Sequence, residues 1–283
     1  MSSTRSQSAA PRRRRGEDLP AEGGPTRTRR ERLRSIFDLL ISLSASDLRL
    51  RHGRGPWVVV RWLLEPFALV GVYLVLLVAV LDRPGTAPGL SLACAIVPFQ
   101  FVMSSVTYSM TAVSLRRPII ANMAFNRTLI PLSTAFTECA GFVASFAIII
   151  LMMAIYGIAP TAALLWLPAV IAVTIVFGVS LAYPASLFGL WFWELRPLGS
   201  SLVRILFFIG PGLVPLAQTG SGTSGYLKLN PLSGLFESFR SVFAYGRAPA
   251  AWQLLIPLGF AAVLLAAFLP LYRRDQREFA KVI

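Results

Sequence analysis

The chain has 283 residues, of which 55% are hydrophobic and only 14% are charged, and its formal net charge is +14. Soluble domains carry about 25% charged residues, so this composition excludes an ordinary soluble domain. Long stretches lack charge: between Thr128 and Trp193 only Glu138 is charged, and residues 248–272 carry none. Apolar runs longer than about 20 residues predict membrane-spanning helices, because barrel strands alternate polar and apolar residues over about 10 residues.

The N-terminal region is strongly basic. Residues 1–61 hold 14 of the 27 Lys and Arg residues, with arginine-rich blocks at 12–15 and 27–34. No aromatic residues separate these arginines, as a surface for stacking bases would need, so we expect no nucleic-acid binding. We interpret residues 1–28 as a disordered, basic cytoplasmic tail near anionic membrane lipids. The first apolar run begins at Trp57, which is too late for a cleaved secretory signal.

The remaining chain predicts an all-α membrane protein. Residues 29–56 are expected to form an interfacial amphipathic helix, since Leu33, Ile36 and Leu40 recur at helical spacing among charged residues. Residues 57–272 predict six spans, at about 57–81, 90–113, 128–156, 161–191, 198–216 and 251–272. The fourth is longer than a bilayer requires, so it tilts, protrudes or breaks near Gly178 or Pro184.

The segment between the last two spans has a different composition. Residues 218–225 have the Gly, Ser and Thr content of a linker, and residues 231–245 resemble a moderately apolar helix. We expect this segment to form one or two short re-entrant helices on the external side, backed by protein.

Loop charges predict the orientation in the cell (inner or plasma) membrane. The loop at 114–127 carries three arginines and the tail at 273–283 is basic, whereas the loop at 157–160 is uncharged. Positive loops stay inside, so both termini and the basic loop are expected in the cytoplasm. The external segment at 217–250 departs from this rule, because it contains Lys228, Arg240 and Arg247.

Sets of residues that would indicate catalysis are missing from the sequence. No G-x-x-x-x-G-K-[ST] motif occurs, and the only lysines are Lys228 and Lys281, so the chain is not expected to bind ATP. Cys94 and Cys139 lie in apolar runs and His52 is the only histidine, which predicts neither a disulfide nor a metal site. We expect no enzyme activity and no cofactor in this chain.

Element order and four local motifs resemble the ABC-2 type exporter permeases, particularly those for O-antigen, teichoic acid and other lipid-linked polysaccharides. The motifs are Asp47-Leu48-Arg49-Leu50-Arg51, Trp62-Leu63-Leu64-Glu65-Pro66, Phe125-Asn126-Arg127 and Asn230-Pro231-Leu232. Two positions depart from the family pattern: Asn126 stands where the family often has Pro, and Trp193-Glu194 where it often has Arg-Asp.

The resemblance implies partners and a cargo. Family permeases work as pairs with two copies of a separate ATPase subunit, which binds the ATP and Mg²⁺, and they export a lipid-linked glycan. The high Ala, Arg and Pro content suggests a GC-rich genome, and by analogy with actinobacteria a cell-wall galactan is one plausible cargo. Alternatives are a small-molecule or drug exporter of the same superfamily, a membrane-embedded glycosyltransferase and a passive scaffold.

The resemblance also suggests roles for particular residues. The basic loop is the candidate contact with the ATPase, or a purely topogenic loop, and the turn before the fifth span is a second candidate contact; their residues are Arg116, Arg117, Pro118, Asn122, Glu194 and Arg196. Asn230, Pro231 and Arg240 are candidates for an external gate. Glu138, Phe99, Tyr108 and Trp191 could line a conduit, although membrane aromatics often serve as packing or interface anchors.

Two further ionisable residues, Glu65 and Arg204, are expected at or inside spans. Such groups usually face a bundle interior or a cavity. Glu65 could instead pair with Arg61 four residues earlier, and Glu138 could be satisfied by Thr134 or Thr137 on its own helix.

Overall fold

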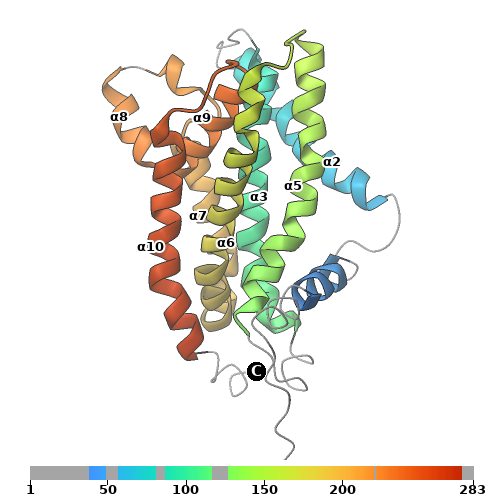
Figure 1. Ribbon diagram of the computed structural model, residues 1–283, viewed down its shortest axis with the longest axis vertical. Helices are drawn as coiled ribbons and strands as arrows, with labels where there is room; N and C mark the ends of the chain where they lie inside the picture. The colour runs from blue at the N-terminus through green and yellow to red at the C-terminus, as the bar shows by residue number, and fades with distance from the viewer. Residues whose placement is uncertain (1–37, 49–56, 81–86, 117–126, 220, 276–283) are drawn as a thin grey trace, which may run out of the picture. The chain divides into compact units, whose positions relative to one another are not determined.

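The computed structural model describes residues 38–48, 57–80, 87–116, 127–219 and 221–275 (Figure 1). Every regular element in these ranges is a helix. The chain divides into two units, Met1–Asp38 and Leu39–Ile283, and all the contacts below belong to the second. The predicted interfacial helix is helical at 38–48, while residues 29–37 and 49–56 and the basic tail at 1–28 lie outside the described residues.

The helices follow the predicted apolar runs closely. In chain order they are α2 (Trp57–Val75), the π-helix η1 (Leu76–Val80), α3 (Pro88–Leu115), α5 (Leu129–Ile155), the 3₁₀ helix η2 (Ala162–Trp166), α6 (Leu167–Trp191), the 3₁₀ turn η3 (Trp193–Leu195), α7 (Arg196–Ile209), the 3₁₀ turn η4 (Leu216–Gln218), α8 (Ser221–Leu229), α9 (Pro231–Phe243) and α10 (Ala251–Asp275). Among the described residues, four helices are long and apolar enough to cross a membrane: α3, α5, α6 with η2, and α10.

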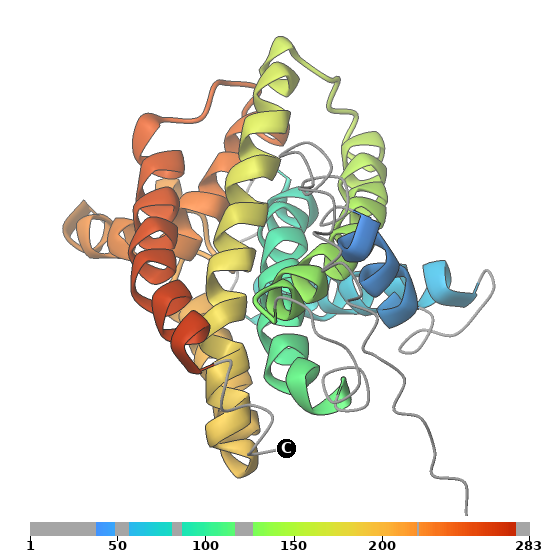
Figure 2. The same cartoon turned by 60° about the horizontal axis from the view of Figure 1, so that its bottom comes forward.

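The predicted fourth span consists of η2 followed directly by α6. α6 runs through both Gly178 and Pro184 without a break. Its glycines serve packing instead. A Cβ at Gly189 would overlap the main chain of Met110, and one at Gly178 would press on the Phe101 ring. These small residues let α6 lie directly against α3, as both views show (Figures 1 and 2).

The predicted fifth span is shorter than expected. α7 ends at Ile209, because Gly210 adopts an extended conformation and is followed by Pro211, which has no amide hydrogen. Its 14 residues measure about 21 Å, less than the about 30 Å of a hydrocarbon core. The expectation of helix up to residue 216 was therefore wrong. The number of membrane crossings made by α2 and α7 stays a prediction.

The segment after α7 contains two short helices. α8 occupies part of the Gly/Ser/Thr-rich stretch that was expected to be a linker, so that expectation was wrong for residues 221–225. α9 lies in the predicted helical stretch, and every residue from Leu232 to Phe243 is buried. Whether the pair re-enters a membrane stays a prediction.

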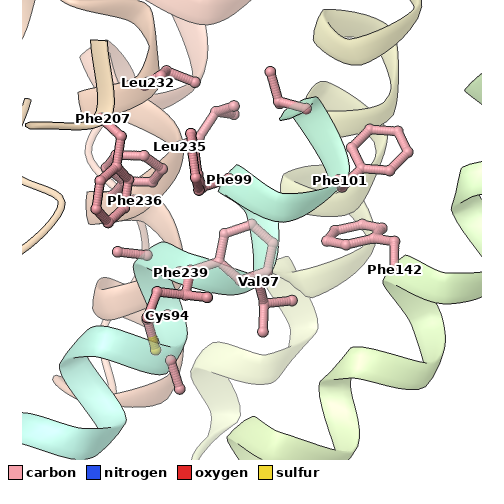
Figure 3. Packing of buried hydrophobic residues seen from close by; sticks show 14 of the residues in the cluster. Cys94, Val97, Phe99, Phe101, Phe142, Phe207, Leu232, Leu235, Phe236 and Phe239 are labelled. Atoms are coloured by element: carbon pink, nitrogen blue, oxygen red, sulfur yellow. The ribbon is translucent and has the colours of Figure 1, made fainter. Parts of the chain in front are cut away.

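The core is built around α3. This helix contacts α2, α5, α6, α7 and α9, and it lies between α5 and α6 in both views (Figures 1 and 2). Figure 3 shows Phe99 of α3 beside Phe207 and Phe236, and Phe101 beside Phe142 of α5. The ring centroids of Phe99 and Phe207 are 4.4 Å apart, and those of Phe101 and Phe142 are 4.9 Å apart. Aromatic packing therefore joins α7, α9 and α5 to α3.

Candidate functional site

A groove of about 500 Å³ lies over α3, between α2 and α7. Its lining comprises Glu65, Leu69 and Tyr73 of α2, Phe99, Gln100, Met103, Ser104, Thr107 and Tyr108 of α3, and Ser200 and Arg204 of α7. A second cavity of about 60 Å³ shares Glu65, Gln100, Ser104 and Tyr108 with it and extends to Glu138, Phe142 and Ser145 of α5. We call the two together the polar groove.

The polar side of α3 follows from helical periodicity. Gln100, Ser104, Thr107 and Tyr108 stand at positions i, i+4, i+7 and i+8, so they share one face of an otherwise apolar helix. Sequence reasoning missed Gln100, Ser104 and Thr107, although this spacing was the signal that could have found them. Polar hydroxyl and amide groups beside aromatic rings give a surface that can hydrogen-bond and stack at the same time.

Ionisable side chains contribute to three walls of the polar groove. Glu65 and Arg204 are exposed, while Glu138 is only 9% exposed. Arg204 lies eight residues into α7 and Glu138 nine residues into α5, which places each about 12–14 Å along its helix. Charged groups within apolar helices usually face a bundle interior or a cavity.

The environment of Glu138 bears on its two proposed roles. The hydroxyl of Thr134 donates to the carbonyl of Ile130, and that of Thr137 donates to the carbonyl of Ser133. These hydroxyl protons are therefore used within the helix, while Glu138 lines the smaller cavity. The side chain of Arg61, the alternative partner of Glu65, lies outside the described residues.

Aromatic rings pack together beside the polar groove. Tyr73 of α2 stacks on Phe207 of α7 with ring centroids 5.9 Å apart, and its edge meets Phe208 at 6.1 Å. Phe99 packs beneath Phe207. Tyr108 and Phe99 both line the groove, whereas Trp191 does not: it is 49% exposed at the end of α6. An exposed tryptophan at the end of a long apolar helix is typical of a membrane-interface anchor.

No family model matches the chain. Its curated relatives are nevertheless similar over nearly their whole length. It is 29% identical over 248 residues to the O-antigen export system permease protein RfbA of Myxococcus xanthus, covering 87% of this chain and 95% of that protein. It is 26% and 27% identical over 256 residues to two proteins of the same name from Klebsiella pneumoniae, covering 88% of this chain and 96% of each.

This similarity supports an ABC-2 type exporter permease. The match covers 87% of this chain, which is far more than one apolar segment.

The residues of the permease that were expected to contact an ATPase differ in their exposure to solvent. Arg116 is only 5% exposed: its guanidinium pairs with Asp47 at 3.1 Å and donates to the carbonyl of Ile130 and the hydroxyl of Thr134. Its charge is thus used inside the permease. Glu194 is exposed in the turn before α7. Arg117, Pro118 and Asn122 lie outside the described residues.

Arg196 of the permease is half-buried at the start of α7. Its guanidinium donates to the carbonyl of Gly189 at 3.0 and 3.1 Å and to the Ser114 hydroxyl at 2.9 Å. This arginine therefore joins the ends of α6 and α3 to the beginning of α7.

The candidate gate residues hold α9 of the permease in place. Asn230 caps the helix, because its side-chain oxygen accepts from the amide of Leu232, and its side-chain amide donates to the carbonyl of Leu206. Pro231 occupies the first turn, where the missing amide hydrogen costs nothing. Arg240 is fully buried and donates to Ser91, Pro211 and Gly212 as well as pairing with Glu237.

Glu237 was missed by sequence reasoning. Its carboxylate also accepts from the amide of Leu216, so one ion pair ties α9 to α3 and to the irregular segment after α7. The signal was a Glu and an Arg three residues apart in an apolar stretch. These contacts favour a fixed α9 over a freely moving one.

Proposed function

We propose that this permease is the transmembrane subunit of an ATP-driven exporter of lipid-linked polysaccharide. It would work as two copies with two copies of an ABC ATPase subunit, which bind ATP and Mg²⁺, and would itself carry out no chemistry. The names of the relatives support a polysaccharide cargo of the O-antigen kind. Cell-wall galactan and teichoic-acid-like polymers share the chemistry of hydroxyl-rich chains on a lipid carrier.

The polar groove is the observation that carries this proposal. It places Arg204, Glu65 and a ladder of hydroxyl and amide groups on a face that lipid tails would penalise. Hydroxyls can satisfy these groups, and sugar rings can stack on Tyr73, Phe99 and Tyr108. A passage for a growing polymer must be continuous, so the open side of the groove would be covered by a second copy related by a two-fold axis.

The orientation in the membrane forms part of the proposal. The permease would lie in the inner or plasma membrane with both termini in the cytoplasm. The C-terminal ends of α3 and α6 would then face the ATPase, and α9 would lie on the external side. The exposed turn around Glu194 and the loop that contains Arg117, Pro118 and Asn122 are the proposed contacts with the ATPase. In this arrangement, α9 with Asn230 and Arg240 is a fixed element at the external end of the path.

Depletion of the permease tests this function. Growth with a radiolabelled sugar should show surface polysaccharide falling while labelled lipid-linked glycan accumulates in membranes, and an ABC ATPase should co-purify with the tagged permease. A drug exporter would leave surface polysaccharide unchanged and alter resistance to toxic compounds instead. A glycosyltransferase would lower the total polymer without accumulation of the lipid-linked form.

A further inference from the structure

Polar contacts join the end of α3 to the 38–48 helix, α5 and α7, and through Arg196 to α6. Arg116, the last described residue of this end, is the C-cap of α3 and pairs with Asp47 in the 38–48 helix. The same guanidinium donates to the carbonyl of Ile130 at 3.1 Å and to the hydroxyl of Thr134 at 3.2 Å, both in α5. Two residues earlier, Ser114 accepts from Arg196 at the start of α7, which also bonds the end of α6.

The 38–48 helix has its own attachments to α5. The hydroxyl of Ser44 donates to the carbonyl of Ser133 at 3.1 Å, and the hydroxyl of Thr137 lies 3.5 Å from the carbonyl of Ser44. Its apolar side chains differ in burial: Leu43 is buried, whereas Ile41 is 52% exposed. Polar contacts therefore contribute much of what fixes this helix to the bundle.

Both ends of the basic loop are thereby anchored. Arg116, near the beginning of the loop, binds α5 and the 38–48 helix. Thr128 stands at the other end, where its carbonyl accepts from the hydroxyl of Tyr183 in α6 at 3.2 Å. The described residues on both sides of segment 117–126 are therefore held by other helices.

We propose that Asp47 and Arg116 are positioning residues, which set the 38–48 helix against the base of the basic loop so that movement of the loop reaches α3 and α5. This inference rests on the proposed function, because it assigns a route for force from the ATPase. A buried ion pair is a weak source of stability but a geometrically specific one, since both charges must find each other in one register. Asp47 and Arg116 are 4% and 5% exposed.

The pair acts through position and not by touching the ATPase. An enclosed guanidinium offers no charge to a second subunit, so Arg116 differs in role from the exposed Glu194. Loss of the Asp47 charge would leave Arg116 with its donors to Ile130 and Thr134, and the 38–48 helix would keep its Ser44 contacts. Asp47→Asn also leaves a buried guanidinium without its carboxylate, which lowers stability, so export is compared per molecule of permease in the membrane.

The test compares Asp47→Asn with Asp38→Asn in the full-length chain, in cells that lack the unaltered copy. Both changes remove one carboxylate charge from the same helix, but Asp38 is exposed. Four quantities are measured: membrane abundance, the amount of co-purifying ATPase, ATP hydrolysis by the purified complex in nanodiscs, and surface polysaccharide labelled by periodate and hydrazide on intact cells.

Asp47→Asn is expected to lower the surface polysaccharide per molecule of permease by about fivefold or more, at the scale of an energetic coupling between sites, while the co-purifying ATPase and the ATP hydrolysis per molecule of permease match those of Asp38→Asn. Asp47→Glu retains the charge and should recover part of the export. Arg116→Lys keeps the charge opposite Asp47 but not the fork of donors, and its export should lie between those of Asp47→Asn and the unaltered chain.

Two results would overturn the inference while the unaltered chain still exports. One is export by Asp47→Asn equal to that by Asp38→Asn. The other is a loss of abundance in both Asp47→Asn and Arg116→Lys that matches the loss of export, which would make the pair a folding element only. If the unaltered chain neither co-purifies with an ATPase nor supports surface polysaccharide, the proposed function itself fails, and this inference fails with it.

Discussion

Arg240 and Glu237 form an ion pair with an N–O distance of 2.9 Å inside the protein, where their side chains are 0% and 5% exposed. The pair links three parts of the chain, because Arg240 also donates to Ser91 and Gly212 while Glu237 accepts from the amide of Leu216. It holds α9 against the beginning of α3.

Glu237→Gln should therefore destabilise the permease strongly. Removing one partner leaves a buried, uncompensated charge, which costs about 3–5 kcal/mol. We expect a much lower thermal midpoint in detergent, measured by fluorescence-detected size-exclusion chromatography after heating. Arg247→Gln is the control, because Arg247 lies close by but is exposed. Equal midpoints for the two variants would contradict a structural role for the pair.

The close approach of α6 to α3 gives a second stability prediction. Gly189→Ala would push a methyl group into the main chain of Met110, and such overpacking costs about 1–3 kcal/mol. Gly259→Ala is the matched control, because nothing lies within 4 Å of a Cβ at that position in α10. We expect a lower thermal midpoint for Gly189→Ala and no loss for Gly259→Ala; the reverse order would show that the helices do not touch at Gly189.

Arg204→Gln tests the polar groove. A hydrogen bond to a charged group contributes about 1.5–3 kcal/mol, so loss of the guanidinium should reduce export about tenfold or more if it contacts the moving polymer. Membrane abundance should not change, since Arg204 is exposed. Arg273→Gln, an exposed arginine near the end of α10, is the control. Export by Arg204→Gln at the level of this control would remove Arg204 from the path.

The proposed orientation is tested by labelling single cysteines in intact cells, in a chain whose own Cys94 and Cys139 are replaced by Ala. Leu115→Cys, at the exposed end of α3, should react with an impermeant maleimide only after the membrane is broken. Ala248→Cys, in the exposed turn before α10, should react in intact cells. Labelling of residue 115 from outside would invert the topology.

Much of the helical layout was predictable from the sequence, because long uncharged runs can satisfy their backbone only as helices. The runs that became α3, α5, α6 and α10 illustrate this, and the helices end within a few residues of the predicted limits. The fifth helix was predicted to be too long because the apolar composition continues past Gly210, whereas the helical backbone ends at Ile209. α8 was missed because a Gly- and Ser-rich composition has a low intrinsic helix propensity, which tertiary context overrode.

The site was only partly predictable. Glu65, Glu138 and Arg204 could be singled out as charges within apolar runs, and all three line the polar groove. What no single stretch of sequence reveals is which partner each charge finds. The sequence suggested that Arg116 is a surface residue of a basic loop. In the structure it is buried and pairs with Asp47, which is far away in the sequence. Arg240 similarly finds Ser91 and Gly212 from distant helices and turns.

The most direct test of the central claim, that the polar groove is the path of the exported polymer, is photocrosslinking during export. A benzophenone amino acid at position 104, which lines both cavities of the groove, should capture labelled glycan in cells that are exporting it. The same probe at position 150, exposed on α5 and outside the groove lining, should not. Continued export with no glycan captured at position 104, or equal capture at both positions, would contradict the account.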